Sequence, residues 1–186
     1  TPIDGNLNAW NRMMQLGAES GVRTEAFYEI QQWLDLDNFV DYMLLNFYSG
    51  NTDWDSSNWR AGRRREEGRG YRFFPWDSER TVGDAAQISV ALGTNTTGRN
   101  IANRPSGLHQ QLARNEDYRL FFADRIQRHF FNGAALSPAG AVSLWNQRVE
   151  ELQLPLIAEA ARWGDAHRPS QPYTPNEEWI REATNL

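Results

Sequence analysis

Two short stretches, Asn51-Thr-Asp-Trp-Asp-Ser-Ser-Asn-Trp59 and Phe73-Phe-Pro-Trp-Asp77, place acids and amides between aromatic residues. The run before them, from Phe39 to Tyr48, is apolar almost all round, which is typical of a buried helix. The aromatic residues on either side of the polar ones predict two short strands, over residues 58–60 and 71–74. The sequence therefore predicts a mostly α lobe of α+β class, in which a small β hairpin carries the polar motifs.

Helical periodicity on both sides of the hairpin completes this fold. Before it, the spacing predicts helices over about 5–18, from residue 24, and over 38–48. Asp4, Thr24 and Asp37 are the predicted N-caps of these helices, and Gly50 is the predicted left-handed C-cap of the third. After the hairpin, further helices are predicted around residues 108–112, 118–131 and 138–152, then from Pro155 and from Pro175. Ser137 is the predicted cap of the helix that turns Val142, Trp145, Val149 and Leu152 inward.

Composition limits what the chain can do. Its 186 residues suit a single domain over residues 1–186, and 40% hydrophobic content supplies a core. Cysteine is absent, which excludes disulfides, cysteine–zinc sites and thiol catalysis. The formal charge of −5 gives no support for a nucleic-acid partner, and no apolar run approaches the length of a membrane span. All 19 basic residues are arginine, so a Walker P-loop and a Ser-x-x-Lys nucleophile are incomplete.

The polar residues of the hairpin follow a spacing that protein kinases use. Asn58 lies five residues after Asp53, and Asp77 lies 24 after Asp53. Kinases order a base Asp, an Asn five residues later that holds a metal, and a second metal-binding Asp. An Asn/Asp-rich turn that bonds its own backbone is the alternative for the same residues. A calcium-binding loop does not fit, because neither possible frame has Gly at position six and Glu at position twelve. A glycosidase carboxylate pair, Asp53 with Asp77, stays open because the sequence does not fix their separation.

Several motifs together resemble the CotH kinase family, the spore-coat protein H-like atypical protein kinases. The central ones are Asn51-Thr-Asp-Trp54 with Asn58-Trp59, and then Phe74-Pro-Trp-Asp-Ser-Glu-Arg80. Softer matches follow in the expected order: Leu112-Ala-Arg-Asn-Glu-Asp-Tyr118, Phe131-Asn-Gly133 and Glu159-Ala-Ala-Arg-Trp-Gly-Asp165. The resemblance covers nearly the whole chain.

The resemblance implies an atypical kinase fold that uses ATP with Mg²⁺ or Mn²⁺ to phosphorylate Ser or Thr of a protein substrate. Carried over by motif, Asp53 is the catalytic base, and Asn58 and Asp77 are metal ligands. Glu79 stands where the family often has a second acid and is expected to add a metal contact, while Arg80 is expected to meet phosphate of the nucleotide. The neighbouring Trp54, Trp59 and Trp76 are expected to wall the site or to pack in the core.

The chain also departs from the family pattern. A complete member has an amino-terminal portion with a nucleotide-gripping basic residue, and Asp4-Gly5 resembles the close of that portion. We therefore expect this chain to be the carboxy-terminal lobe, inactive by itself, within a secreted or cell-surface protein that has further domains. The alternative expectation is a non-catalytic binding or scaffold module of a bacterial secreted or surface protein.

Overall fold

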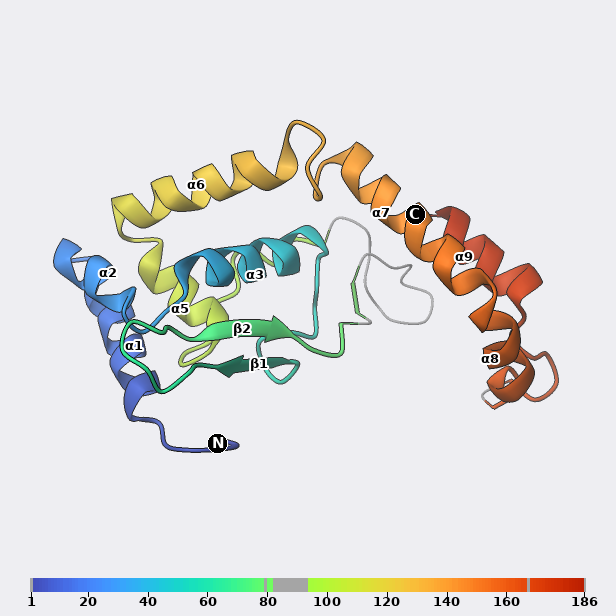
Figure 1. Cartoon of the computed structure of the whole chain (residues 1–186), viewed down its shortest axis with the longest axis horizontal. Helices are drawn as coiled ribbons and strands as arrows, with labels where there is room; N and C mark the ends of the chain where they lie inside the picture. Colours follow the sequence, from blue (N-terminus) through green and yellow to red (C-terminus); the bar gives the residue numbers. More distant parts are fainter. Residues whose placement is uncertain (1, 79, 82–93, 167, 186) are drawn as a thin grey trace. The chain divides into compact units, whose positions relative to one another are not determined.

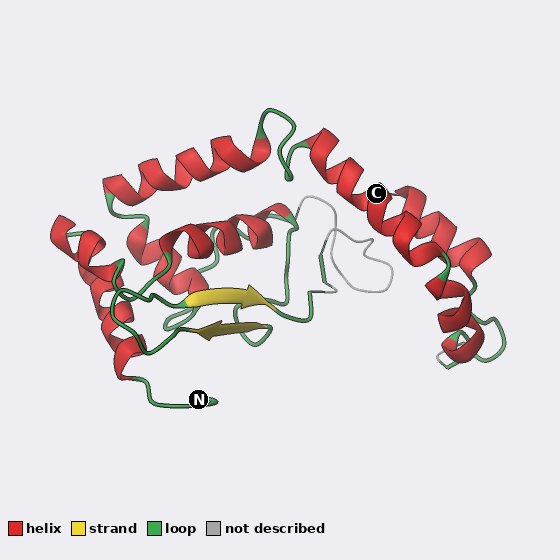
Figure 2. Ribbon diagram, viewed as in Figure 1, coloured by secondary structure: helices red, strands yellow, loops and turns green. Residues whose placement is uncertain are grey.

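The computed structural model describes residues 2–78, 80–81, 94–166 and 168–185. Within them the chain is mostly helical and has one antiparallel sheet of two strands (Figures 1 and 2). The predicted α+β class with a mostly α content is thereby confirmed. The chain divides into two compact units, Thr1–Gln127 and Arg128–Leu186, which we call the first and the second unit. The prediction of a single domain over residues 1–186 stays a prediction.

The first unit is built from helices around the hairpin. The described helices that begin in it are α1 (Asn8–Glu19), α2 (Thr24–Ile30), α3 (Leu36–Tyr48), α5 (Pro105–Leu112) and α6 (Glu116–Phe130). Helix α1 packs against α2 and α5, and α3 packs against α5 and strand β2. No helix in the described part of the chain is long and apolar enough to cross a membrane.

The core of the first unit centres on α3. Seven of its thirteen residues are buried, as its nearly continuous apolar pattern predicts. Fully buried side chains from other elements complete this core: Met13, Leu16, Ile30, Trp54, Phe73, Leu108, Leu112 and Tyr118. Burial of this much apolar surface is the main source of stability for the unit. The hairpin and the loop before it are therefore attached to a well-packed support.

The first three helices begin where the sequence predicts to within a few residues, but their predicted N-caps are wrong. The cap of α3 is Asp35, whose side chain accepts a hydrogen bond of 3.0 Å from the backbone nitrogen of Asn38. Asp37 lies inside the first turn of that helix. Asp4 precedes α1, whose N-cap position is held by an apolar leucine, and Thr24 is itself the first residue of α2. Where two acids stand close together, the sequence does not say which one starts the helix.

The hairpin consists of β1 (Trp59–Gly62) and β2 (Arg72–Pro75), which pair antiparallel with Ala61 opposite Phe73. Asn38 of α3 fixes β2, because its amide accepts from the Phe73 nitrogen at 2.6 Å and donates to the Phe73 carbonyl at 3.2 Å. The Phe73 ring packs on this same helix and is almost fully buried. The hairpin is thus attached to the core through both its backbone and its side chains.

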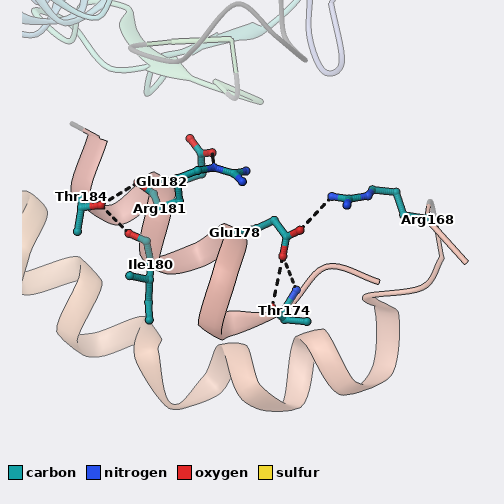
Figure 3. A network of polar contacts seen from close by, with 7 residues as sticks. All are labelled: Arg168, Thr174, Glu178, Ile180, Arg181, Glu182 and Thr184. Carbon is teal, nitrogen blue, oxygen red and sulfur yellow. Dashed lines mark hydrogen bonds and ion pairs between the residues drawn. The ribbon is translucent and has the colours of Figure 1, made fainter. Parts of the chain in front are cut away.

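The second unit contains the end of α6, then α7 (Pro138–Gln153), α8 (Pro155–Trp163), the π-helical turn η1 (Pro175–Trp179) and α9 (Ile180–Asn185). Ser137 caps α7 by accepting from the Gly140 nitrogen at 3.1 Å, and Pro155 is the first residue of α8, so both predictions are confirmed. Figure 3 shows the polar contacts between the loop that follows α8 and the turn η1. There Glu178 accepts from the Thr174 nitrogen at 2.8 Å and from Arg168 at 3.1 Å.

The apolar face predicted for α7 is only partly covered by the residues that the structure describes. Val142 and Leu152 are about half exposed, and none of the described residues in α7, α8 or η1 is buried. Trp145 and Val149 are intermediate, and the Trp145 indole donates to the Ala183 carbonyl at 2.9 Å. The prediction that Val142 and Leu152 face inward is therefore wrong. Periodicity identifies an apolar face, but it does not say whether another element covers that face.

Candidate functional site

The loop that carries Asp53 is connected to the core by two buried amides. Gly50 ends α3 with a φ of +59°, as predicted for its left-handed cap. The Asn51 side chain accepts from the backbone nitrogen of Asp53 at 3.0 Å and donates to the Asn46 side chain at 3.0 Å. Asn46 in turn donates to the Tyr42 carbonyl at 2.8 Å. These bonds extend from the middle of α3 to the backbone of Asp53.

Asn58 brings the three central polar residues together. Its amide nitrogen lies 3.0 Å from Oδ2 of Asp53 and 3.4 Å from the carbonyl oxygen of Asp77. The hairpin makes this possible, because Asn58 directly precedes β1 and Asp77 follows β2, while Trp59 pairs with Pro75. Asp77 has a φ of +50°, a left-handed conformation that Asp tolerates better than most residues. Two residues 19 positions apart thus share one corner with Asp53.

Arg80 also reaches Asp53. Its Nε lies 3.7 Å from Oδ2 of Asp53, and its carbonyl accepts from the Thr52 nitrogen at 3.3 Å. The segment after β2 therefore contacts the loop through a backbone hydrogen bond and through an ion pair. Glu79, predicted as a further metal contact, lies outside the described residues.

The three tryptophans near the site have different surroundings. Trp54 is fully buried and packs against Tyr42 of α3. Trp59 is partly buried and stacks on Trp10 of α1, with ring centroids 5.6 Å apart. Trp76, next to Asp77, is 59% exposed, and the guanidinium of Arg60 lies over its ring. Trp54 is thus a core residue, whereas Trp76 lies at the surface beside the site.

Three functional candidates escaped the sequence analysis. Asp55 is fully buried with a φ of +77°, and its carboxylate accepts from the Ser106 backbone nitrogen at 2.9 Å and from the Ser106 hydroxyl. Burial raises the pKa of Asp55, while the two bonds from Ser106 oppose that rise. Arg99 donates to the carbonyls of Thr52 and Trp54 at 2.9 and 2.8 Å. All these partners are more than 40 residues apart in sequence, so no local pattern indicated them.

The donor types at this corner suit a hard divalent cation held together with phosphates. Asn58 directs its amide nitrogen to Asp53, so its oxygen faces elsewhere, and the Asp77 side chain is exposed to solvent. Magnesium prefers oxygen ligands, and one or two protein groups suffice when substrate phosphates and water supply the rest. Among the residues that the structure describes, no cluster of three or more His, Asp or Glu could hold a metal by itself. The oxygens of Asn58 and Asp77 would thus supply part of a metal site whose other ligands are phosphate and water.

A hollow of about 500 Å³ lies elsewhere, in the second unit. Its walls include the aromatic residues Trp163, Tyr173 and Trp179, together with the acids Glu159 and Glu178. None of the predicted site residues that the structure describes lines it, and Glu178 is already engaged by Arg168 and Thr174. This hollow is thus separate from the corner around Asn58.

Comparison with known protein families gives a match. The family described as CotH kinase protein matches residues 7–147, which is more than half of the chain and includes every described site residue above. The matched region ends within α7 and so extends beyond the first unit. Neither the curated proteins nor the solved structures gave a match.

Proposed function

The chain belongs to the CotH kinase family, and from this premise we propose that it supplies the catalytic and metal-binding lobe of an ATP-dependent atypical protein kinase. The substrate is the hydroxyl group of Ser or Thr in a protein. The family supports a kinase-type enzyme in general. The reaction, the lobe assignment and the residue roles are our inference from the site.

The observation that carries the proposal is the position of Asn58. A single amide nitrogen contacts the carboxylate of Asp53 and the backbone of Asp77. Kinase active sites need a base, a metal-binding amide and a metal-binding acid within one small volume. Here the hairpin delivers those three residue types to one corner. The bond to residue 77 is to its backbone carbonyl, so the metal-binding role of the Asp77 carboxylate rests on its place in the motif, 24 residues after Asp53.

Each residue has a chemical role in this proposal. Asp53 orients the substrate hydroxyl and accepts its proton, while the hydrogen bond from Asn58 fixes the orientation of its carboxylate. The Arg80 guanidinium beside Asp53 offsets the repulsion between the acids of the site and lies within reach of a phosphate. Little covalent help from protein is needed, since phosphoryl transfer depends on positioning and charge neutralisation.

ATP and Mg²⁺, or Mn²⁺, are the proposed cofactors. The metal would be held by the oxygen of Asn58 and the carboxylate of Asp77, with Glu79 as a further candidate. When bound, the metal neutralises charge on the phosphates. The chain's own residues then hold the hydroxyl at Asp53 in line with the transferred group.

We test the proposal by phosphate transfer from ATP with the full-length protein. Asp53→Ala and Asp77→Ala should each reduce transfer at least ~100-fold, because each removes a group needed for proton acceptance or metal binding. Asp124→Ala is the matched control, since Asp124 is an exposed acid on α6 far along the chain. Undiminished transfer in either site variant would contradict the assignment.

The contact of Asn58 with the backbone carbonyl of Asp77, rather than with its carboxylate, favours a second candidate function, a non-catalytic scaffold module of a secreted or cell-surface protein. Calorimetry of the full-length protein with ATP and magnesium separates the two functions, because the scaffold should release no binding heat. For the isolated chain we propose weak nucleotide binding, and a micromolar or tighter dissociation constant would contradict this.

A further inference from the structure

Asp55 belongs to the same loop as Asp53 and Asn58, but its side chain is directed into the interior. It is fully buried, whereas Asp53 and Asn58 are partly exposed. Its Oδ1 accepts from the backbone nitrogen of Ser106 at 2.9 Å, and its Oδ2 accepts from the Ser106 hydroxyl. Both oxygens of this buried carboxylate are therefore bound by one residue, 51 positions along the chain.

Ser106 is itself fixed in place. It is the second residue of α5, so its backbone N–H is one of the groups that have no partner within the helix. The positive end of the helix dipole favours a carboxylate there. Its hydroxyl oxygen also accepts from the Ile101 nitrogen at 2.8 Å. At Gly107, an added Cβ would lie 2.2 Å from the Ile101 carbonyl, so this turn is closely packed.

Further hydrogen bonds on both sides of Asp55 hold the backbone of the loop. Arg99 donates to the carbonyls of Thr52 and Trp54, immediately before Asp55. After it, the Trp59 indole nitrogen donates to the Asp55 carbonyl at 3.1 Å. These contacts maintain the positive φ of Asp55, a conformation that costs free energy outside glycine. That turn is what separates the inward Asp55 from the outward Asp53.

We propose that Asp55 and Ser106 form a lock that holds the loop 51–58 in the conformation that presents Asp53 and Asn58 to substrate. Asp55 is then a positioning residue for the phosphoryl transfer, and this part rests on the function proposed above. Misplacement of a catalytic group by about 1 Å can cost roughly 100-fold in rate. Displacement of this loop is therefore expected to lower the rate of phosphoryl transfer strongly.

The first measurement needs no activity. Hydrogen exchange of the Trp59 indole N–H, assigned by its loss in Trp59→Phe, reports on loop opening. Asp55→Asn should speed this exchange by about tenfold, because the charge-assisted bonds from Ser106 to the buried carboxylate are replaced by weaker bonds with a neutral amide. Ser106→Ala removes the hydroxyl and keeps the backbone bond, so a smaller increase is expected. Ser106→Thr keeps both donors and should restore slow exchange.

The second measurement is phosphate transfer by the full-length protein. Asp55→Asn and Ser106→Ala should lower kcat by about 10-fold or more and raise the KM for ATP by a smaller factor, because Asp53 and Asn58 lie in the loop whereas Asp77 and Arg80 lie outside it. Ser137→Ala is the control, since it removes a helix cap in the second unit without touching this loop. Ser106→Thr should recover kcat.

The two measurements distinguish failure of the Asp55–Ser106 lock from failure of the proposed function. Unchanged indole exchange in both Asp55→Asn and Ser106→Ala would overturn the lock. Faster exchange in these variants, with no transfer even by the unmodified protein, would overturn the proposed function and leave the lock standing. If Asp55→Asn does not fold, Ser106→Ala with Ser106→Thr carries the test. An equal loss of kcat in Ser137→Ala would also overturn the positioning role.

Discussion

The first and second units differ in how completely they bury their large apolar residues. The fully buried large side chains that the structure describes all belong to residues before 128. In the second unit, large apolar residues remain at the surface: Phe131, Val142, Leu144, Leu152, Leu154, Ile157, Trp163 and Ile180. Both units contain several helices, so the presence of helices alone does not distinguish them. The comparison shows that helix content and core formation are separate properties of a chain.

The difference matters for function, because the candidate site is in the unit with the core. Asp53, Asn58 and Asp77 are exposed or partly exposed groups attached to buried supports, namely α3, Phe73 and Trp54. Catalytic groups need such support to keep their geometry. The second unit lacks an equivalent support among its described residues, although the family match extends into it. We therefore expect the units to respond differently to the same kind of substitution.

The largest expected difference comes from removing the same side chain in each unit. Leu112→Ala in α5 truncates a fully buried residue and should cost about 2–5 kcal/mol of the free energy of unfolding, from lost burial and a cavity. Leu154→Ala truncates a residue that is 77% exposed and should change it by less than about 0.5 kcal/mol. Chemical denaturation followed by region-resolved hydrogen exchange measures both. Equal losses would show that the exposed leucine is packed in solution.

A second expected difference is a response to acid in the first unit. Burial lowers the pKa of His109 to about 4, and its ring contacts the Tyr118 hydroxyl at 2.8 Å. Because the unfolded chain takes up a proton near pH 6.5 and the folded chain does not, stability falls as pH drops from about 6.5 towards 4. The full loss is about 3 kcal/mol.

The comparison of unmodified protein with His109→Gln isolates this contribution, because the other titrating groups are shared. Asp55 acts in the opposite direction, since its raised pKa makes the folded form bind a proton more tightly as pH falls. The stability difference between the two proteins should shrink or reverse between pH 7 and pH 4.5. A difference that stays constant over this range would contradict a buried, neutral His109.

Ion pairs provide a third, smaller contrast. Arg125 is buried and bidentate to Asp41, with Asp37 at 3.6 Å, whereas Arg148 and Glu151 form an exposed pair in α7. Asp41→Ala should cost about 2 kcal/mol, less than a fully buried pair, because Asp41 is partly exposed. Glu151→Ala should cost less than about 1 kcal/mol. Thermal unfolding at low and high salt checks both, and a larger loss in Glu151→Ala would reverse the comparison.

The parts of the fold that sequence predicted well are those with local causes. The burial of α3 follows from its apolar residues, and the meeting of Asn58 with Asp77 follows from one short hairpin. The capping by Ser137 depends on residues three positions away. The last two interactions join residues that are close in sequence, and the first depends on the apolar pattern of a single helix. A short stretch of sequence therefore contains the information for each of them.

Apart from the N-caps, the parts that the sequence analysis missed depend on residues far apart in the chain. The bonds of Asp55 to Ser106 and of Arg99 to Thr52 join positions 51 and 47 residues apart. Without a fold, nothing marks Asp55 as different from Asp53, although one is buried and the other is not. Val142 and Leu152 show a related limit. Periodicity identifies the apolar face of a helix, but it does not say whether another element covers that face. The roles assigned to Asp53, Asn58, Asp77, Glu79 and Arg80 stay predictions.

The smallest expected effect is also the one that best tests whether the units unfold separately. The Ser137 hydroxyl accepts from the Gly140 nitrogen at 3.1 Å and donates to the Ala134 carbonyl at 2.7 Å, so Ser137→Ala removes both bonds at the start of α7. A lost N-cap costs about 1 kcal/mol, which corresponds to about fivefold faster exchange of the amides it protects. With little buried surface to resist opening, the second unit should show this increase in α7 while α5 exchange stays unchanged. Ser137→Asp keeps an acceptor at the cap and should restore slow exchange in α7. If Ser137→Ala instead speeds exchange in α5 and α7 equally, the two units open as one cooperative body, and their different burial does not translate into different stability.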